Sequence, residues 1–316
     1  MRSAAKHASS AYLSSLLSCK SLVEQVAPSL DLHLDSDQAL EHLNSVLDLE
    51  EGNITEEVAF GMNQKQLSTL IYGTVYRSLL GLADDVREKA RLHSVGLPHA
   101  GDFLLVVTSP SLGLQLRPTE FRISVLYRLG MPVFQSEGAC IACDQYSDRY
   151  GDHAVGCVSQ GERIARHNHL RDAIYHTAQS AQLGPLREER ALLPGSERPA
   201  DVLLPHHAGG LHEALDVCVV SSLQGQLVER ASEEPGHALV HRYQQKWRKY
   251  GEACLREGIA FQPVPFEVLG GLHKASVIVI KKLGQALARA TGQDGKEVSR
   301  HLFGRLGVLL QRGNQV

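Results

Sequence analysis

Two short apolar segments, each carrying a single aspartate, are the parts of this chain best suited to do chemistry. Arg198–Leu204 reads Arg-Pro-Ala-Asp-Val-Leu-Leu and contains Asp201. Ala214–Val220 reads Ala-Leu-Asp-Val-Cys-Val-Val and contains Asp216. Proline and glycine residues separate the segments, so the pattern predicts two neighbouring β-strands.

Two carboxylates on adjacent strands have a specific electrostatic consequence. A lone carboxylate is costly to bury, and two close together repel each other unless a cation lies between them. A divalent metal held by two carboxylates, with a lysine nearby, is a recurring arrangement for hydrolysing phosphodiesters. Asp201 and Asp216 are therefore candidate metal ligands. The structural alternative is that each aspartate caps a strand or pairs with an arginine.

A second candidate site combines three cysteines and a histidine. Cys140, Cys143, His153 and Cys157 follow the spacing C-x2-C-x9-H-x3-C. Three thiolates and one imidazole complete a tetrahedral Zn²⁺ site with no open position, so the predicted role of the zinc is structural. Chance clustering of reduced cysteines is the alternative. The other three cysteines have no partner at ligand spacing.

A polar, cationic segment follows the cysteine cluster directly. Residues 163–176 fit an amphipathic helix with Ile164, Leu170 and Ile174 facing inward. Arginine side chains on the other face could bind phosphate oxygens with a planar fork of donors. A salt-bridged surface helix is the alternative reading. The candidate nucleic-acid-binding residues are Arg163, Arg166, His167, Asn168 and Arg171.

The elements around these sites follow from hydrophobic periodicity. The N-terminal region is helical by its apolar spacing, and one of its helices is expected over Asn63–Arg91. Asp102–Val107 is a strand candidate, and a helix opened by Pro118 ends at Gly130. We expect four regions, namely a helical region 1–96, a linker strand and helix 97–139, a zinc knuckle 140–160 and a mixed-sheet domain 161–316.

The C-terminal part completes a mixed architecture. Gly258–Val268 is a strand whose prolines indicate an edge position, since proline cannot donate to a sheet. Lys274–Ala290 and Val298–Leu310 have helical apolar spacing. The predicted fold class is α+β: a helical N-terminal region, a small zinc knuckle, then a mixed sheet flanked by helices.

Composition sets bounds on the function. The chain has 316 residues, of which 43% are hydrophobic and 21% charged, as in ordinary globular proteins. It has no apolar run of membrane-spanning length and no apolar secretory leader, so we expect an intracellular protein without a membrane partner. The net charge of −3 is unfavourable for binding nucleic acid. Any such binding must come from local basic patches.

The order of these motifs resembles a known arrangement. A C-C-H-C knuckle, a helix containing Arg166-His167-Asn168, a P-x-D strand and an L-D-V strand occur in this order. They resemble the C-terminal region of site-specific, LINE-like (non-LTR) retrotransposon polyproteins. There a zinc knuckle precedes a restriction-endonuclease-like domain of the PD-(D/E)xK class. The resemblance covers about residues 97–270.

The resemblance assigns roles to the acidic residues. Asp201 matches the aspartate of the Pro-Asp strand, although Ala200 is inserted and the motif becomes P-x-D. Asp216 matches the second metal-binding carboxylate. Glu189, shortly before the first aspartate strand, is a candidate third ligand. Together these residues would bind a catalytic Mg²⁺.

This sequence departs from the common PD-(D/E)xK pattern in the position of its lysine. Cys218 stands two residues after Asp216, where the lysine is expected. In the retrotransposon endonucleases the lysine lies in the following helix. Lys246 and Lys249 are one helical turn apart there, so either could lie beside the carboxylates.

The resemblance implies a metal-dependent DNA endonuclease that nicks strands in the nucleus, with structural Zn²⁺ and with DNA or RNA as the partner. The chain lacks an aromatic-x-Asp-Asp turn, so we expect the C-terminal piece of a longer polyprotein or a relic without its polymerase. The inserted Ala200 and the cysteine at position 218 favour a first alternative, a catalytically decayed zinc-knuckle nucleic-acid-binding module. A protein-interaction domain is a second alternative, supported by the acidic net charge.

Overall fold

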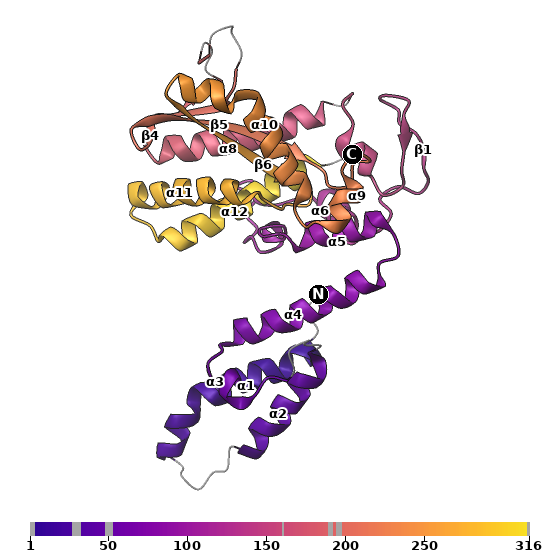
Figure 1. Ribbon diagram of the computed structural model, residues 1–316, viewed down its shortest axis with the longest axis vertical. Helices are drawn as coiled ribbons and strands as arrows, with labels where there is room; N and C mark the ends of the chain where they lie inside the picture. Colours follow the sequence, from indigo (N-terminus) through magenta and orange to yellow (C-terminus); the bar gives the residue numbers. More distant parts are fainter. Residues whose placement is uncertain are drawn as a thin grey trace. The chain divides into compact units, whose positions relative to one another are not determined.

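The chain forms two compact units. The structure, a computed structural model, describes residues 4–26, 33–47, 53–159, 161–188, 192–193 and 198–314 (Figure 1). The first unit spans Met1–Ala83 and the second spans Asp84–Val316. The boundary therefore lies before residue 96, where the helical N-terminal region was expected to end.

The first unit is helical, as its apolar spacing predicts. It contains α1 (Ala4–Val26), α2 (His33–Val46), α3 (Glu56–Phe60) and α4 (Gln64–Leu82). Asn63 caps α4 by accepting the N–H of Gln66 at 3.0 Å. A small core of its own holds the unit together, with Leu13, Leu43, Leu67 and Ile71 fully buried. The candidate site residues described below all belong to the second unit.

The single helix expected over Asn63–Arg91 is two helices. After α4, a second helix, α5 (Val86–Gly96), begins at Asp85, whose carboxylate accepts the N–H of Glu88 at 2.7 Å. An aspartate at this position starts a helix better than it continues one, because its side chain satisfies a free N–H group. Helix α5 belongs to the second unit, where it packs against α9 (Val228–Glu233).

The second unit is built on a four-stranded mixed sheet of order β3-β4-β5-β6. Its strands are β3 (Leu186–Arg187), β4 (Val202–Ala208), β5 (Leu211–Val220) and β6 (Ile259–Glu267). The first three run antiparallel, and β6 lies parallel to β5. The two predicted aspartate strands therefore form the β4–β5 pair. β6 lies at the edge of the sheet, as its prolines predicted.

Helices cover both faces of the sheet (Figure 1). α8 (Glu162–Ser180), α11 (Lys274–Thr291) and α12 (Gly295–Arg312) pack on one face, and α10 (His237–Arg256) packs on the other. Alternate residues of β5 serve the two faces, because side chains alternate along a strand. Leu215 and Val217 enter the core of the three-helix face. Ala214 enters the smaller core beneath α10. The architecture agrees with the predicted α+β class.

The expected strand Asp102–Val107 does not form. Asp102–Leu104 is a short 3-10 helix instead. Its Phe103 is buried and packs closely on the backbone of Gly307 in α12. β-propensity mainly reflects a fit to a pleated, half-buried surface, and this segment packs on a helix rather than beside a strand.

The helix expected after Pro118 is α6 (Pro118–Arg128), and Gly130 follows it with φ of +69°. Of the helices that the structure describes, none is long and apolar enough to cross a membrane.

Candidate functional site

The four predicted zinc ligands lie on a small frame of their own. β1 (Gly138–Ala139) pairs with β2 (Tyr146–Ser147), and the turn between these strands carries the first two cysteines. A short helix, α7 (Asp152–Gly156), carries His153 and is followed by Cys157. The first pair of ligands thus lies in a turn, and the second pair lies in and directly after a short helix.

The donor atoms converge on one point. The ligand atoms of Cys140, Cys143, His153 and Cys157 all lie within 4.8 Å of one another. Cys143 Sγ is 3.3 Å from His153 Nε2, and Cys157 Sγ lies 3.6 Å from Cys143 Sγ and 4.0 Å from Cys140 Sγ. Zn–S bonds of about 2.3 Å require sulfurs about 3.8 Å apart in a tetrahedron. The geometry and the donor set therefore fit zinc, although other thiophilic metals use the same ligands.

Two carboxylates fix the knuckle loop and attach it to the rest of the unit. Asp148 accepts backbone N–H groups at the start of α7, including that of His153 at 2.8 Å. Burial opposes ionisation of Asp148, but these hydrogen bonds outweigh it and lower the pKa. Asp152 accepts a bidentate pair from Arg87 of α5 at 2.5 and 2.9 Å. The knuckle is thus attached to the rest of the second unit by a residue that is not one of the four metal ligands.

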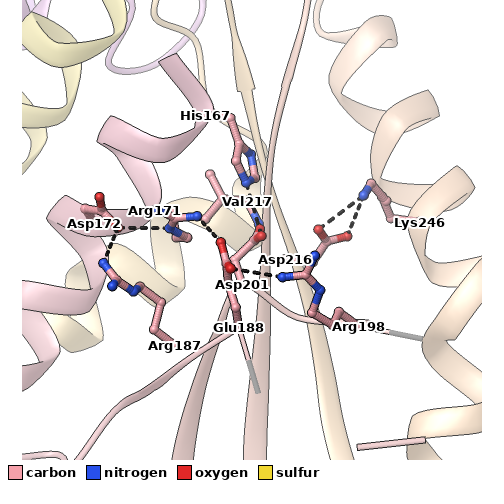
Figure 2. A network of polar contacts seen from close by, with 10 residues as sticks. All are labelled: His167, Arg171, Asp172, Arg187, Glu188, Arg198, Asp201, Asp216, Val217 and Lys246. Atoms are coloured by element: carbon pink, nitrogen blue, oxygen red, sulfur yellow. Dashed lines mark hydrogen bonds and ion pairs between the residues drawn. The ribbon is translucent and has the colours of Figure 1, made fainter. Parts of the chain in front are cut away.

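The two aspartates of the β4–β5 pair lie beside each other (Figure 2). Asp201 directly precedes β4, where its N–H donates to the carbonyl of Leu215 at 2.9 Å. Its carboxylate Oδ2 accepts the N–H of Val217 at 2.7 Å. Asp201 is therefore bonded to the residues on both sides of Asp216. The backbone register thus brings the two predicted acids to the same place.

Lys246 of α10 is the lysine that reaches this pair. Its Nζ donates to Asp216 Oδ1 at 3.1 Å and lies 3.0 Å from Oδ2 (Figure 2). Lys249, the alternative, lies with its Nζ 4.6 Å from the ring centre of Tyr250. The structure thus places Lys246, and not Lys249, against the carboxylates.

Asp216 is the more buried of the two acids, with 6% of its surface exposed. Burial raises its pKa to about 6, the charge of Lys246 opposes this shift, and the charge of Asp201 adds to it. Its Oδ2 is buried, and its contact is the ion pair with Lys246 Nζ at 3.0 Å. A buried carboxylate beside a second carboxylate has the oxygen ligands that a hard cation prefers.

Asp201 is oriented from the opposite helix. His167 Nε2 of α8 lies 3.1 Å from Asp201 Oδ1 (Figure 2). This contact raises the pKa of His167 against the opposing effect of burial. The histidine was predicted as a nucleic-acid contact, and its observed partner is the first acid. Only tertiary structure could reveal this pairing, because 34 residues separate the two.

Two other residues of the predicted site have different outcomes. Glu189 lies outside the described residues. Cys218 lies two residues after Asp216 on β5, on the same face of the sheet, and burial raises its pKa to about 12. The cysteine is therefore a neutral thiol at the position where a lysine was expected.

The cationic face of α8 is only partly as predicted. Arg163 is exposed and His167 and Asn168 are half-buried, whereas Arg166 and Arg171 are buried.

Arg171 belongs to an ion-pair network within the protein. It pairs with Asp172 at 2.9 Å and with Glu188, and Glu188 also pairs with Arg198 at 2.9 Å (Figure 2). A nucleic-acid contact at Arg171 therefore stays a prediction, on a side chain that is already paired with acids. Its charge is already neutralised by the acids beside β3.

The burial of Arg166 and Ile164 is the reverse of the prediction: the arginine is buried and the isoleucine is exposed. Arg166 donates to Asn314 Oδ1 at 2.6 Å near the end of the chain. Burial and the neighbouring Arg163 lower the pKa of Arg166 to about 10. Ile164, expected to point inward, is 67% exposed. The first turn of α8 extends past the core, so apolar periodicity does not report burial there.

A cleft of about 450 Å³ adjoins the acid–lysine site. Its walls come from α8, β5, α10 and the end of the knuckle. Sequence reasoning missed Arg242, which lies one helical turn before Lys246; that spacing was the available signal. The residues that line the cleft are Val158, Arg163, Ile164, Arg166, His167, Val217, Cys218, Val219, Arg242 and Lys246.

Comparison with known proteins adds no identification. No family model matches the chain, and no curated protein is detectably similar to it in sequence.

Proposed function

We propose that this protein is a divalent-metal-dependent nuclease that nicks DNA, with Asp201 and Asp216 as its metal ligands. The observation that supports this most strongly is the buried Asp216 carboxylate, which has a second acid beside it and Lys246 against it. A cationic cleft adjoins these groups. A DNA substrate would place the protein in the nucleus.

The proposed metal is Mg²⁺. Two carboxylates are enough protein ligands for this ion, which usually keeps several waters and substrate phosphate oxygens in its octahedron. When bound, Mg²⁺ supplies a Lewis acid for the scissile phosphate and a water of lowered pKa. Among the described residues, only the cysteine–histidine cluster brings three or more ligand side chains together. Water, the phosphate or Glu189 must therefore complete the magnesium site.

The protein side chains would each have a distinct task. Asp201 is fixed on one side by His167 and on the other by the N–H of Val217, so its carboxylate is held in one orientation. Lys246 would stabilise the negative charge that builds on the phosphate oxygens in the transition state. The cleft wall on α8 would bind the strand, with Arg163 as its exposed cation.

The fold and the knuckle support the proposal as well. A mixed sheet with a helix on each face is the architecture that the retrotransposon endonuclease resemblance implies. The zinc knuckle precedes this sheet in the chain, also as in that arrangement. A restriction-endonuclease-like core is therefore part of the proposal.

Nicking of supercoiled plasmid tests the proposed activity. We expect wild-type protein with Mg²⁺ to convert supercoiled plasmid to the open circular form, and Asp216→Asn to reduce the rate at least 100-fold, as for loss of a group that positions a catalytic metal. Glu252→Gln, exposed on α10, is the matched control and should keep the wild-type rate. Equal nicking by wild type and Asp216→Asn would show that a contaminant or another site cuts the plasmid.

A nucleic-acid-binding module without cleavage is the second candidate. The ion pair between Asp216 and Lys246 and the cysteine at position 218 favour it, because a neutralised acid has less need of a metal. DNA binding in a gel-shift assay that weakens steeply with salt, together with no nicking at any Mg²⁺ concentration, would select this candidate.

A further inference from the structure

The cleft beside the acid–lysine site has cations on two facing elements. Arg163 and Arg166 come from α8, and Arg242 and Lys246 come from α10. Of these four side chains, only Lys246 forms an ion pair with a carboxylate within the described part of the chain. The cleft therefore has an excess of positive charge that the described residues do not neutralise.

Arg166 and Arg242 each have a buried Nε without a hydrogen-bond partner among the described residues, and Arg242 is the one that shares α10 with Lys246. Its Nη1 donates to Gln245 Oε1 at 2.7 Å, one turn along the same helix. Its Nε is buried and has no hydrogen-bond partner among the described residues. A buried guanidinium nitrogen without an acceptor is costly, and an incoming anion would remove that cost.

The spacing of Arg242 and Lys246 indicates which anion. Four residues of an α-helix rise about 6 Å, and residues so spaced lie on one face. Both side chains line the same cleft. Neighbouring phosphates of a polynucleotide strand have a comparable separation, so one strand could place one phosphate at each side chain.

We propose that Arg242 is a positioning residue that binds the phosphate next to the scissile phosphate on the same strand. The assignment of the scissile phosphate to Lys246 rests on the proposed nuclease function; the presence of a phosphate subsite at Arg242 does not. The strand backbone then runs along α10, with Arg163 on the facing wall.

The margin of the cleft fits the bases of that strand. Val158, at the end of the knuckle, is 77% exposed and Ile164, in the first turn of α8, is 67% exposed. Both line the cleft beside the cations. Sites for a nucleic-acid strand commonly combine cations along the backbone with aromatic side chains that stack on bases. Here the aliphatic Val158 and Ile164 would make apolar contacts with the bases in place of aromatic rings.

Salt-dependent binding tests the subsite independently of cleavage. The probe is a fluorescent DNA duplex, and the protein carries Asp216→Asn and receives no Mg²⁺, so that the strand stays intact. Loss of one phosphate contact lowers the slope of log K against log salt by about one. We expect Arg242→Gln to lower the slope by this amount and Arg242→Lys to keep it.

The matched control is Arg248→Gln, which removes the same charge from an exposed position of α10 outside the cleft. It should leave the slope unchanged. The subsite would be overturned if Arg242→Gln had the same salt slope as the Asp216→Asn parent. It would also be overturned if Arg248→Gln lowered the slope as much as Arg242→Gln.

Competition with inorganic phosphate at constant ionic strength separates a strand site from a site for free anions. We expect weak competition, because free phosphate cannot occupy both contacts at once. Strong competition would overturn the strand assignment.

Failure of the subsite and failure of the proposed function give different results. A slope change at Arg242 without plasmid nicking by the wild type supports the subsite and rejects the nuclease. Nicking with an unchanged slope supports the nuclease and rejects the subsite.

Discussion

In the proposed nuclease, Asp216 and Lys246 would be the residues on which the chemistry of the site depends. The carboxylate is almost fully buried, and the amine contacts both of its oxygens. A buried ion pair is weak evidence for stability, since desolvation of both charges offsets their attraction. The proposed nuclease function would explain why this costly buried pair is kept.

The two lysines of α10 should differ strongly in their effect on nicking. Lys246→Ala should reduce the rate by about 10²–10³-fold, as removal of one group that stabilises transition-state charge does elsewhere. Lys249→Ala should stay within about threefold, because Lys249 lies over Tyr250 instead. Single-turnover nicking rates measure both. A larger loss for Lys249 would reassign the catalytic lysine.

A lysine at position 218 should replace Lys246 in part. Position 218 faces the cleft on the same side of β5 as residue 216, so a longer side chain there can extend into open space. The double variant Lys246→Ala/Cys218→Lys should nick at least tenfold faster than Lys246→Ala alone. Cys218→Met, of similar length without charge, is the control and should recover nothing.

At the scale of elements, the knuckle has little secondary structure of its own, and its four convergent ligands are compatible with zinc. Its strands have two residues each and its helix has five, too few to form a hydrophobic core. The Arg87–Asp152 pair attaches α7 to α5 without contributing to the metal ligands. Zinc binding by the knuckle and its attachment to α5 are therefore separate contributions to its stability.

Replacement of one ligand tests the first contribution. Cys143→Ser should lower the bound zinc from about one ion per chain to near zero, since three ligands hold Zn²⁺ much less tightly than four. Elemental analysis of purified protein measures it. Cys254→Ser, which changes a buried thiol outside the knuckle, should keep its zinc. Full zinc content in Cys143→Ser would reject the Cys3His assignment.

Spacing predicted those features that depend on short stretches of chain. The C-x2-C and H-x3-C pairs predicted the convergent ligands, and the Val- and Leu-rich segments around Asp201 and Asp216 predicted two neighbouring strands. In both cases local sequence contains the information, because ligand pairs and strands form within ten residues or so.

Features that depend on distant packing could not be predicted this way. Lys246 and Lys249 share a helical face in the sequence, and only the angle of α10 on the sheet distinguishes them. Arg171 has the pattern of a surface cation but pairs with Glu188, which lies 17 residues away in the chain. Asp102–Val107 has strand propensity but no strand beside it.

At the scale of the whole molecule, the two units have separate cores. The core of the first unit consists of residues 13–71, and the other core clusters lie within 90–310. A chain that begins at Asp84 should therefore fold, bind zinc and keep its nicking activity within about threefold, provided that the nuclease proposal holds. Circular dichroism, zinc analysis and plasmid nicking measure these properties. Aggregation or loss of zinc would show that the units depend on each other.

The stability of the second unit should decrease as the pH rises through the weakly acidic range. Glu267, fully buried at the end of β6, has its pKa raised by burial from 4.5 to about 7, although hydrogen bonds from Ser222 and Leu269 and the charge of Arg166 oppose this shift. Between these two values the folded state binds more protons than the unfolded state, so stability falls with rising pH. The expected loss is on the order of 3 kcal/mol.

Urea denaturation between pH 4.5 and 8 measures this contribution. Gln cannot ionise, so Glu267→Gln should lose this part of the slope of unfolding free energy against pH. Any cost of the amide itself would lower stability equally at every pH and leave the slope unaffected. The same slope in wild type and variant would assign the pH dependence to other groups.

A metal shared by Asp201, directly before β4, and Asp216 of β5 is the central proposal. Direct metal binding tests it without reference to cleavage. Calorimetric titration of zinc-loaded protein with Mn²⁺, as a probe for Mg²⁺, should show one site that disappears in Asp201→Asn and in Asp216→Asn and remains in Glu252→Gln. Unchanged Mn²⁺ binding in either aspartate variant would contradict a metal shared between the two acids.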